Sequence, residues 1–100
     1  MASIKSIKNK FDDPSLDMLS LSDAFNISQS TVAMHIKKNT GLSFKEVLAN
    51  IRIENAKTLL KTTDLPIEKI WNLSGFSNER TFFRVFKSKV GMTPNQYKKL

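Results

Sequence analysis

The side chains best suited to recognition chemistry lie in residues 78–87, which read Asn-Glu-Arg-Thr-Phe-Phe-Arg-Val-Phe-Lys. If this stretch is a helix, Phe82 and Phe86 share one apolar stripe, because positions four apart lie on the same face. Arg80 and Arg84 then lie one turn apart on the outward side. A guanidinium donates paired hydrogen bonds to guanine O6 and N7 or to a phosphate, so this face has the chemistry to bind nucleic acid.

The outward set of this helix is larger than the two arginines, and the roles of two members stay open. Glu79 can accept a hydrogen bond from cytosine N4, or it can pair with a neighbouring arginine. Phe83 can pack on a thymine methyl group, or it can complete the protein core. The predicted contact residues of this helix are Asn78, Glu79, Arg80, Phe83, Arg84 and Lys87.

A stretch with the same organisation lies fifty residues earlier. Val32 and Ile36 would face the core, and the predicted contact residues beside them are Ser30, Thr31, Ala33, Met34 and Lys37. Small and apolar side chains can touch thymine methyl groups but cannot form paired hydrogen bonds with base edges. We therefore expect this helix to discriminate weakly between DNA sequences.

Phosphate contacts are expected where helix N-termini and basic side chains flank the two faces. The predicted groups are helices capped by Ser28, Ser77 and Thr93, and the ammonium groups of Lys37 and Lys87. His35 is expected to have a structural role. Arg52 is expected to act as a structural clamp and not as a base reader.

The elements that would position these faces follow from an internal repeat. When the sequence is shifted by fifty positions, Gly41-Leu42-Ser43 falls on Gly91-Met92-Thr93. Each glycine suits the left-handed residue that closes a helix. Ser43 with Glu46, and Thr93 with Gln96, form capping boxes that would start the next helix.

Upstream of each glycine, a short apolar segment, a tight turn and a second helical segment follow one another, which is the helix-turn-helix pattern. The first unit would include residues 1–42 and the second residues 62–100. Apolar residues recur at helical spacing between them, which predicts a connecting helix over residues 43–61, about 27 Å long. The predicted fold class is all-α, with about seven helices forming two helix-turn-helix units joined by a long central helix. We expect residues 1–100 to form a single domain with one hydrophobic core.

Several fixed spacings resemble those of AraC/XylS-type transcription regulators over about residues 16–100. The motif residues are 52–60, which read Arg-Ile-Glu-Asn-Ala-Lys-Thr-Leu-Leu, then Ile67, Ile70, Gly75-Phe76-Ser77, Phe82–Lys87, Gly91–Pro94 and Tyr97. The resemblance implies a DNA-binding domain whose two recognition helices enter adjacent segments of the major groove. It also implies a C-terminal part of a longer regulator, whose effector site and dimerisation surface lie elsewhere. We therefore expect the isolated domain to be monomeric.

The amino-terminal residues fit the family's first helix, with Ile4, Ile7 and Phe11 at helical spacing. Three other positions depart from the family pattern. Ile36 stands where phenylalanine is usual, Trp71 where a small alanine is usual, and Phe83 where the residue is usually small or polar. The Trp71 ring requires either a shifted helix pair or a place at the surface.

Charge and composition narrow the function classes. The formal net charge is +7, and residues 51–100 hold ten Lys/Arg against four Asp/Glu, as expected of a protein that neutralises phosphates. The chain has no cysteine and one histidine, and it shows no nucleophile, base or phosphate-binding glycine loop at catalytic spacing. We expect no cofactor, no metal and no enzyme activity. Without a long apolar run or a signal-like segment, we expect no membrane association and a cytoplasmic, nucleoid-associated protein.

The predicted function is sequence-specific binding of double-stranded DNA by the DNA-binding part of a transcription regulator, with activation favoured. RNA polymerase is a further candidate partner. The alternative is a protein-interaction module in which a degenerate helix-turn-helix contacts polymerase or another regulator. The uncharged reading face of the first unit suggests this alternative.

Overall fold

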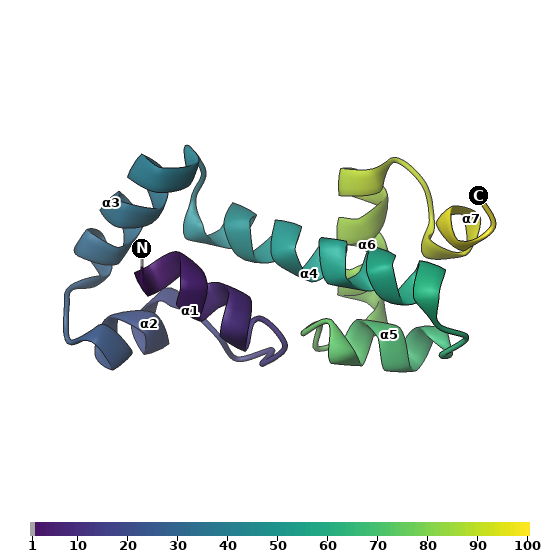
Figure 1. Ribbon diagram of the computed structural model, residues 1–100, viewed down its shortest axis with the longest axis horizontal. Coiled ribbons are helices and arrows are strands. Elements are labelled where there is room, and N and C mark those ends of the chain that lie inside the picture. The colour runs from purple at the N-terminus through teal and green to yellow at the C-terminus, as the bar shows by residue number, and fades with distance from the viewer. Residues whose placement is uncertain (1) are drawn as a thin grey trace.

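The computed structural model describes the chain from residue 2 to residue 100, with side chains described from residue 5 onward. Within that part the chain forms seven helices and no strand, so the all-α prediction is confirmed. The helices are α1 (Ala2–Lys10), α2 (Met18–Phe25), α3 (Gln29–Thr40), α4 (Phe44–Thr62), α5 (Ile67–Leu73), α6 (Glu79–Val90) and α7 (Pro94–Lys98) (Figure 1). The side chain of Ile4, expected on the first helix, lies outside the described residues.

Local capping explains where α4 and α7 begin. Ser43 Oγ accepts a hydrogen bond from the Glu46 N–H at 3.2 Å, and Glu46 Oε1 accepts one from the Ser43 N–H at 3.4 Å. Thr93 and Gln96 form the same reciprocal pair at 3.2 Å and 2.9 Å. These bonds satisfy N–H groups that the first turn of a helix leaves without partners. Both predicted capping boxes are therefore confirmed.

Two further boundary predictions have different outcomes. Gly41 and Gly91 close α3 and α6 with φ of 75° and 85°, so the expected left-handed residues are confirmed. The predicted cap of α6 at Ser77 is wrong, because the helix begins one residue later and Asn78 caps it. Asn78 is extended, and its Oδ1 accepts a hydrogen bond from the Thr81 N–H at 2.8 Å. Ser28 caps α3 as expected.

The central helix α4 contributes residues to two separate hydrophobic clusters, so the expectation of one core is wrong. Val47 and Leu48 near its start pack with α1, α2 and α3, whereas Ile53, Ala56 and Leu60 further along pack with α5 and α6. At about 100° per residue the two sets lie on nearly opposite faces of the helix. The two clusters therefore lie at different positions along α4 and largely on different faces of it.

This division gives the molecule an elongated shape of 43 × 22 × 22 Å. Figure 1 shows α3 and α6 towards opposite ends of the molecule, with α4 running between the two groups of helices. Among the described residues, no helix combines the length and the apolar character needed to cross a membrane. The fold thus consists of two helix-turn-helix units, α2–α3 and α5–α6, connected by α4 as predicted.

Candidate nucleic-acid interface

Helix α6 presents the basic face that was predicted for it. Phe82 and Phe86 are completely buried in the second cluster. The predicted contact residues on the solvent side are exposed: Glu79, Arg80, Arg84 and Lys87. In the part of the chain that the structure describes, the recorded ion pair joins Lys57 to Glu54, so Glu79 does not pair with either arginine. Three cations and one carboxylate are therefore available to an external partner.

The other two predicted residues of this helix have structural roles in addition. Asn78 Oδ1 holds the start of α6, as described above. Phe83 is half-buried against the second cluster, and its ring centroid lies 5.7 Å from that of Phe82 in an edge-on arrangement. The geometry therefore supports the core role of Phe83, with only part of the ring presented to solvent.

Trp71 is accommodated in α5 without leaving the protein core. Its ring is half-buried against the second cluster. The indole Nε1 is buried and finds no hydrogen-bond partner among the described residues. A buried N–H without a partner is destabilising, so this position combines apolar packing with an unsatisfied donor.

Helix α3 presents a face of a different character. Val32 and Ile36 are completely buried. Ser30, Met34 and Lys37 are exposed, whereas Thr31 and Ala33 are half-buried. The Thr31 hydroxyl lies 2.9 Å from the Ser28 hydroxyl at the helix cap. The face is thus small and apolar apart from Lys37, and 58% of the Met34 surface is accessible.

A basic cleft adjoins the face of α6, and the residue pattern alone does not predict it. A cavity of about 230 Å³ lies between α4 and the second unit, and its lining includes Lys45, Arg52 and Arg84. A neighbouring depression shares Lys45 and Arg84 and adds Lys89. The sequence shows both lysines, but nothing in their local pattern distinguishes them from ordinary solvated lysines.

The electrostatics of Glu46 show that charges from both units meet at the start of α4. Hydrogen bonds from Ser43 are the main cause that holds the pKa of Glu46 below its ordinary value. Lys37 at the end of α3 and Lys89 at the end of α6 lower this pKa further, while desolvation opposes the shift. Lys37 and Lys89 are 52 positions apart in the chain, yet both act on one carboxylate.

Arg52 has the clamp role that was expected of it. Its Nε and Nη2 donate hydrogen bonds to the main-chain carbonyls of Phe11 and Asp13. Burial lowers the pKa of Arg52 from its ordinary value, and the Asp13 carboxylate opposes that shift. The pKa of Asp13 itself is lowered, first by hydrogen bonds from Ser15. Since an arginine stays protonated in proteins, the clamp is a cation whose donors point at backbone oxygens.

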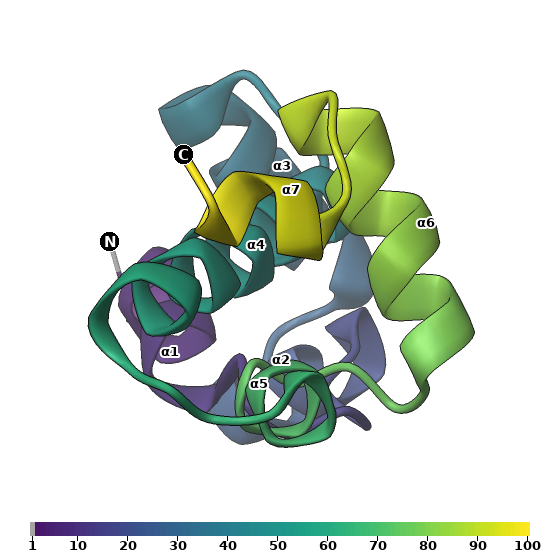
Figure 2. The same cartoon turned by 90° about the vertical axis from the view of Figure 1, so that its right-hand side faces the viewer.

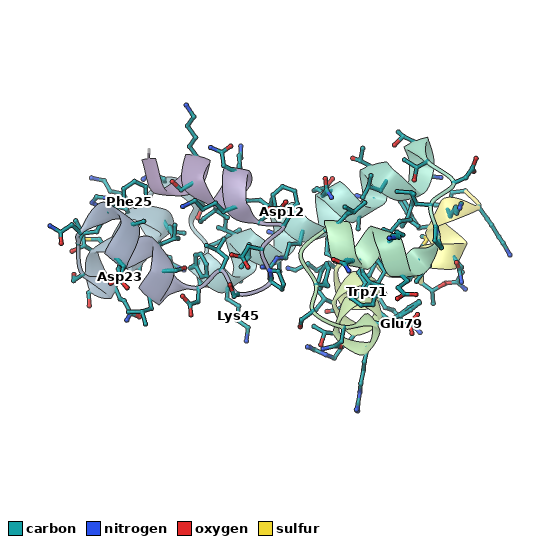
Figure 3. The ribbon with its side chains drawn as sticks, turned by 90° about the horizontal axis from the view of Figure 1, so that it is seen from below. Asp12, Asp23, Phe25, Lys45, Trp71 and Glu79 are labelled. Carbon is teal, nitrogen blue, oxygen red and sulfur yellow. The ribbon has the colours of Figure 1, made fainter. Side chains whose placement is uncertain are left out.

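The two recognition helices are presented in related orientations. In the view along the long axis, α3 and α6 both begin towards the lower right and run to the upper left, and α6 lies opposite α1 (Figure 2). Lys45 lies between the two units on the side from which α6 projects (Figure 3). The exposed face of α6 and the cleft therefore belong to one side of the molecule.

A family model described as a helix-turn-helix domain matches residues 21–100. The chain belongs to the AraC-type helix-turn-helix family. It is 35% identical to the HTH-type transcriptional activator CfaD of Escherichia coli over 78 residues, which are 77% of this chain and 29% of the activator. The C-terminal domain of AraT, a response regulator from Geobacillus stearothermophilus, is 33% identical with a TM-score of 0.95, over 98% of this chain and 81% of that one.

A third similarity concerns the fold alone. The DNA-binding domain of AdpA, a global transcriptional factor solved with a target DNA, superposes with a TM-score of 0.90 at 19% identity, over 98% of this chain and 87% of that one. The resemblance to AraC-type regulators that the motifs suggested is confirmed, as is the arrangement of two helix-turn-helix units. The chain spans less than a third of the length of the curated activator that it matches.

Proposed function

We propose that this chain binds double-stranded DNA in a sequence-specific manner, as the DNA-binding part of a transcription regulator. In this proposal α3 and α6 enter adjacent segments of the major groove while α4 keeps them apart. The observation that carries it is the presence of two exposed recognition faces connected by one 19-residue helix. At 1.5 Å per residue this helix is about 28 Å long, comparable with the roughly 34 Å repeat of the duplex.

The two helices contribute unequally. The exposed guanidinium groups of Arg80 and Arg84 read guanine or hold phosphates, and Glu79 accepts from cytosine N4. On α3, Ser30, Ala33 and Met34 meet base edges with few hydrogen bonds to offer. The remaining polar and basic residues of the predicted set contact the DNA backbone: Thr31, Lys37, Asn78 and Lys87. Phe83 presents only the exposed part of its ring to a thymine methyl group.

The basic cleft adds to this interface a surface that would face the DNA backbone between the two groove segments. In this proposal, a DNA strand that passes from one recognition helix to the other crosses the space in front of Lys45 and Lys89, which line this cleft and the depression beside it. Each ammonium that meets a phosphate releases condensed counterions, so it steepens the salt dependence of binding. Lys45→Gln is expected to reduce the slope of log Kd against log salt by about 1 and to weaken all sequences alike. An unchanged slope would remove Lys45 from the interface.

In vitro selection of bound duplexes tests the main proposal. The expected result is a bipartite motif about one helical turn across, with stronger base preference in the half that α6 reads. Binding should also weaken steeply between about 50 and 200 mM salt. If the duplexes recovered after several rounds shared no sequence motif, sequence-specific binding would be contradicted.

The regulatory setting belongs to the same proposal. CfaD carries the name of a transcriptional activator, which supports activation with RNA polymerase as a further partner. A protein with this role acts on chromosomal DNA in the cytoplasm, at the nucleoid. The isolated domain is proposed to be monomeric, to need no cofactor and to have no catalytic role, and effector binding is assigned to other parts of the regulator.

One observation favours a second candidate function. The exposed Met34 on α3 suits contact with a protein surface as well as with thymine methyl groups. In that case the first unit holds polymerase or another regulator. A fluorescence titration with nonspecific duplex at low salt separates the two, since a chain that serves only as a protein-interaction module would give a flat response.

A further inference from the structure

The loop between α1 and α2 is fastened to the central helix by one side chain. Arg52 Nε donates a hydrogen bond to the carbonyl oxygen of Phe11 at 2.8 Å, and Arg52 Nη2 donates one to the carbonyl oxygen of Asp13 at 2.8 Å. These acceptors lie 41 and 39 positions away along the chain. Because both are main-chain atoms, the bonds fix the course of the loop whatever its side chains do.

The turn of the second helix-turn-helix unit touches the same point. Gly75 has φ of +91°, and a Cβ there would collide with the carbonyl oxygen of Phe11 and lie 2.7 Å from Arg52 Nε. The backbone of the second unit is therefore in direct contact with the loop of the first. A loop of one unit, the central helix and a turn of the other unit meet at Arg52.

This junction lies at the boundary between the two hydrophobic clusters. Ile51 packs against the first cluster, and Ile53 is part of the second. The substantial helix contacts of each unit are within that unit or with α4. Long helices are rarely straight, and α4 alone does not fix the rotation of the helices that pack on its two halves. The mutual orientation of the units therefore depends on α4 and on the contacts around Arg52.

We propose that Arg52 is a positioning residue that locks the orientation of α3 relative to α6, and thereby sets the half-site spacing that the chain accepts in DNA. This inference rests on the proposed function. Each base pair added between half-sites turns the second by roughly 35° around the duplex axis. A rigid pair of units matches one spacing, whereas a flexible pair matches several and loses the advantage of preorganisation.

The test measures Kd on duplexes whose half-sites are moved apart or together by one and two base pairs, and on each half-site alone. The proteins are the wild type, Arg52→Gln, and Arg52→Lys, which keeps the charge but not the forked pair of donors. Lys8→Gln is the control, because it removes an equal charge from an exposed residue of α1. The ribbon of α1 lies on the side of the molecule opposite α6 (Figure 2).

The wild type and the Lys8 control are expected to lose affinity about tenfold or more when the spacing changes by two base pairs. In both Arg52 variants the Kd values at the different spacings should differ by about threefold or less, and the affinity at the best spacing should be lower than that of the wild type. A decrease in affinity of the same size at every spacing would show only an effect of charge and would overturn the inference. Failure of the wild type to bind any duplex would instead refute the proposed function.

A second measurement does not depend on DNA. The chain has no cysteine, so spin labels can be placed at cysteines replacing the exposed Lys38 on α3 and Lys69 on α5. The distribution of distances between the labels should be narrow in the wild type and clearly broader in Arg52→Lys. Equally narrow distributions in a folded variant would overturn the inference even if the proposed function holds.

Discussion

Replacing Gly75 by alanine probes a close backbone approach between the two units. The residue has φ of +91°, and the added methyl group would meet the Phe11 carbonyl oxygen. That oxygen cannot retreat easily, because Arg52 holds it. Gly91 offers a matched control, since its φ is +85° but no atom of the described residues lies within 4 Å of the position of its Cβ.

The expected magnitudes follow from these two environments. Left-handed backbone costs an alanine about 1–2 kcal/mol, and this term applies to both variants. Forcing a methyl group into a filled space costs about 1–3 kcal/mol more, and this term applies to Gly75→Ala alone. Gly75→Ala should therefore lose about 2–5 kcal/mol of unfolding free energy, and Gly91→Ala about 1–2 kcal/mol.

Urea unfolding followed by far-ultraviolet circular dichroism and by tryptophan fluorescence measures the difference. Trp71 is the only tryptophan and packs in the second unit, so its fluorescence reports on that unit. The unfolding midpoint of Gly75→Ala should lie on the order of 1 M below that of Gly91→Ala at an unchanged slope. Equal losses in the two variants would refute the reasoning, since the contact with Phe11 would then add nothing to the backbone strain.

Three further outcomes are expected. Arg84→Ala should lose about 1–3 kcal/mol of specific DNA binding in a mobility-shift titration while its melting temperature stays close to that of the wild type; unchanged affinity would remove Arg84 from the site. Trp71→Phe removes the buried Nε1 donor that lacks a partner. The unfolding free energy of this variant should therefore stay within about 1 kcal/mol of the wild-type value despite the smaller ring. A loss of several kcal/mol would mean that the indole N–H is satisfied in the wild type. Because the pKa of Glu46 is lowered in the folded protein, its carboxylate stabilises the fold above the ordinary pKa of 4.5, and this contribution disappears as the pH falls through the folded pKa. Glu46→Gln should therefore lose less melting temperature than the wild type as the pH is lowered. Melting-temperature profiles that run parallel in the two proteins would contradict this.

The faces of the proposed interface were largely predictable because they depend on helical periodicity. Burial of Phe82 and Phe86 leaves Arg80 and Arg84 exposed on the other side of α6 whatever packs against the helix. Lys45 and Lys89 were not predictable as members of the site. Their position in the cleft depends on how α6 lies against α4, which the spacing of residues in one helix does not determine.

The amino-acid sequence by itself determined the features whose hydrogen-bonding partners lie within one or two helical turns of each other along the chain. The capping boxes at Ser43 and Thr93 and the left-handed residues at Gly41 and Gly91 are of this kind, because each is satisfied by atoms within four residues. The position of the α6 cap was missed by one residue, since neighbouring Ser77 and Asn78 can both accept the required hydrogen bond.

Only the tertiary structure decided how the two units are joined. It placed the apolar residues of α4 in two clusters, and it brought Phe11, Arg52 and Gly75 together from distant parts of the chain. Such contacts depend on the angles at which whole helices pack and on the course of the loops between them. Those angles result from many side chains acting together, so no local pattern of residues specifies them.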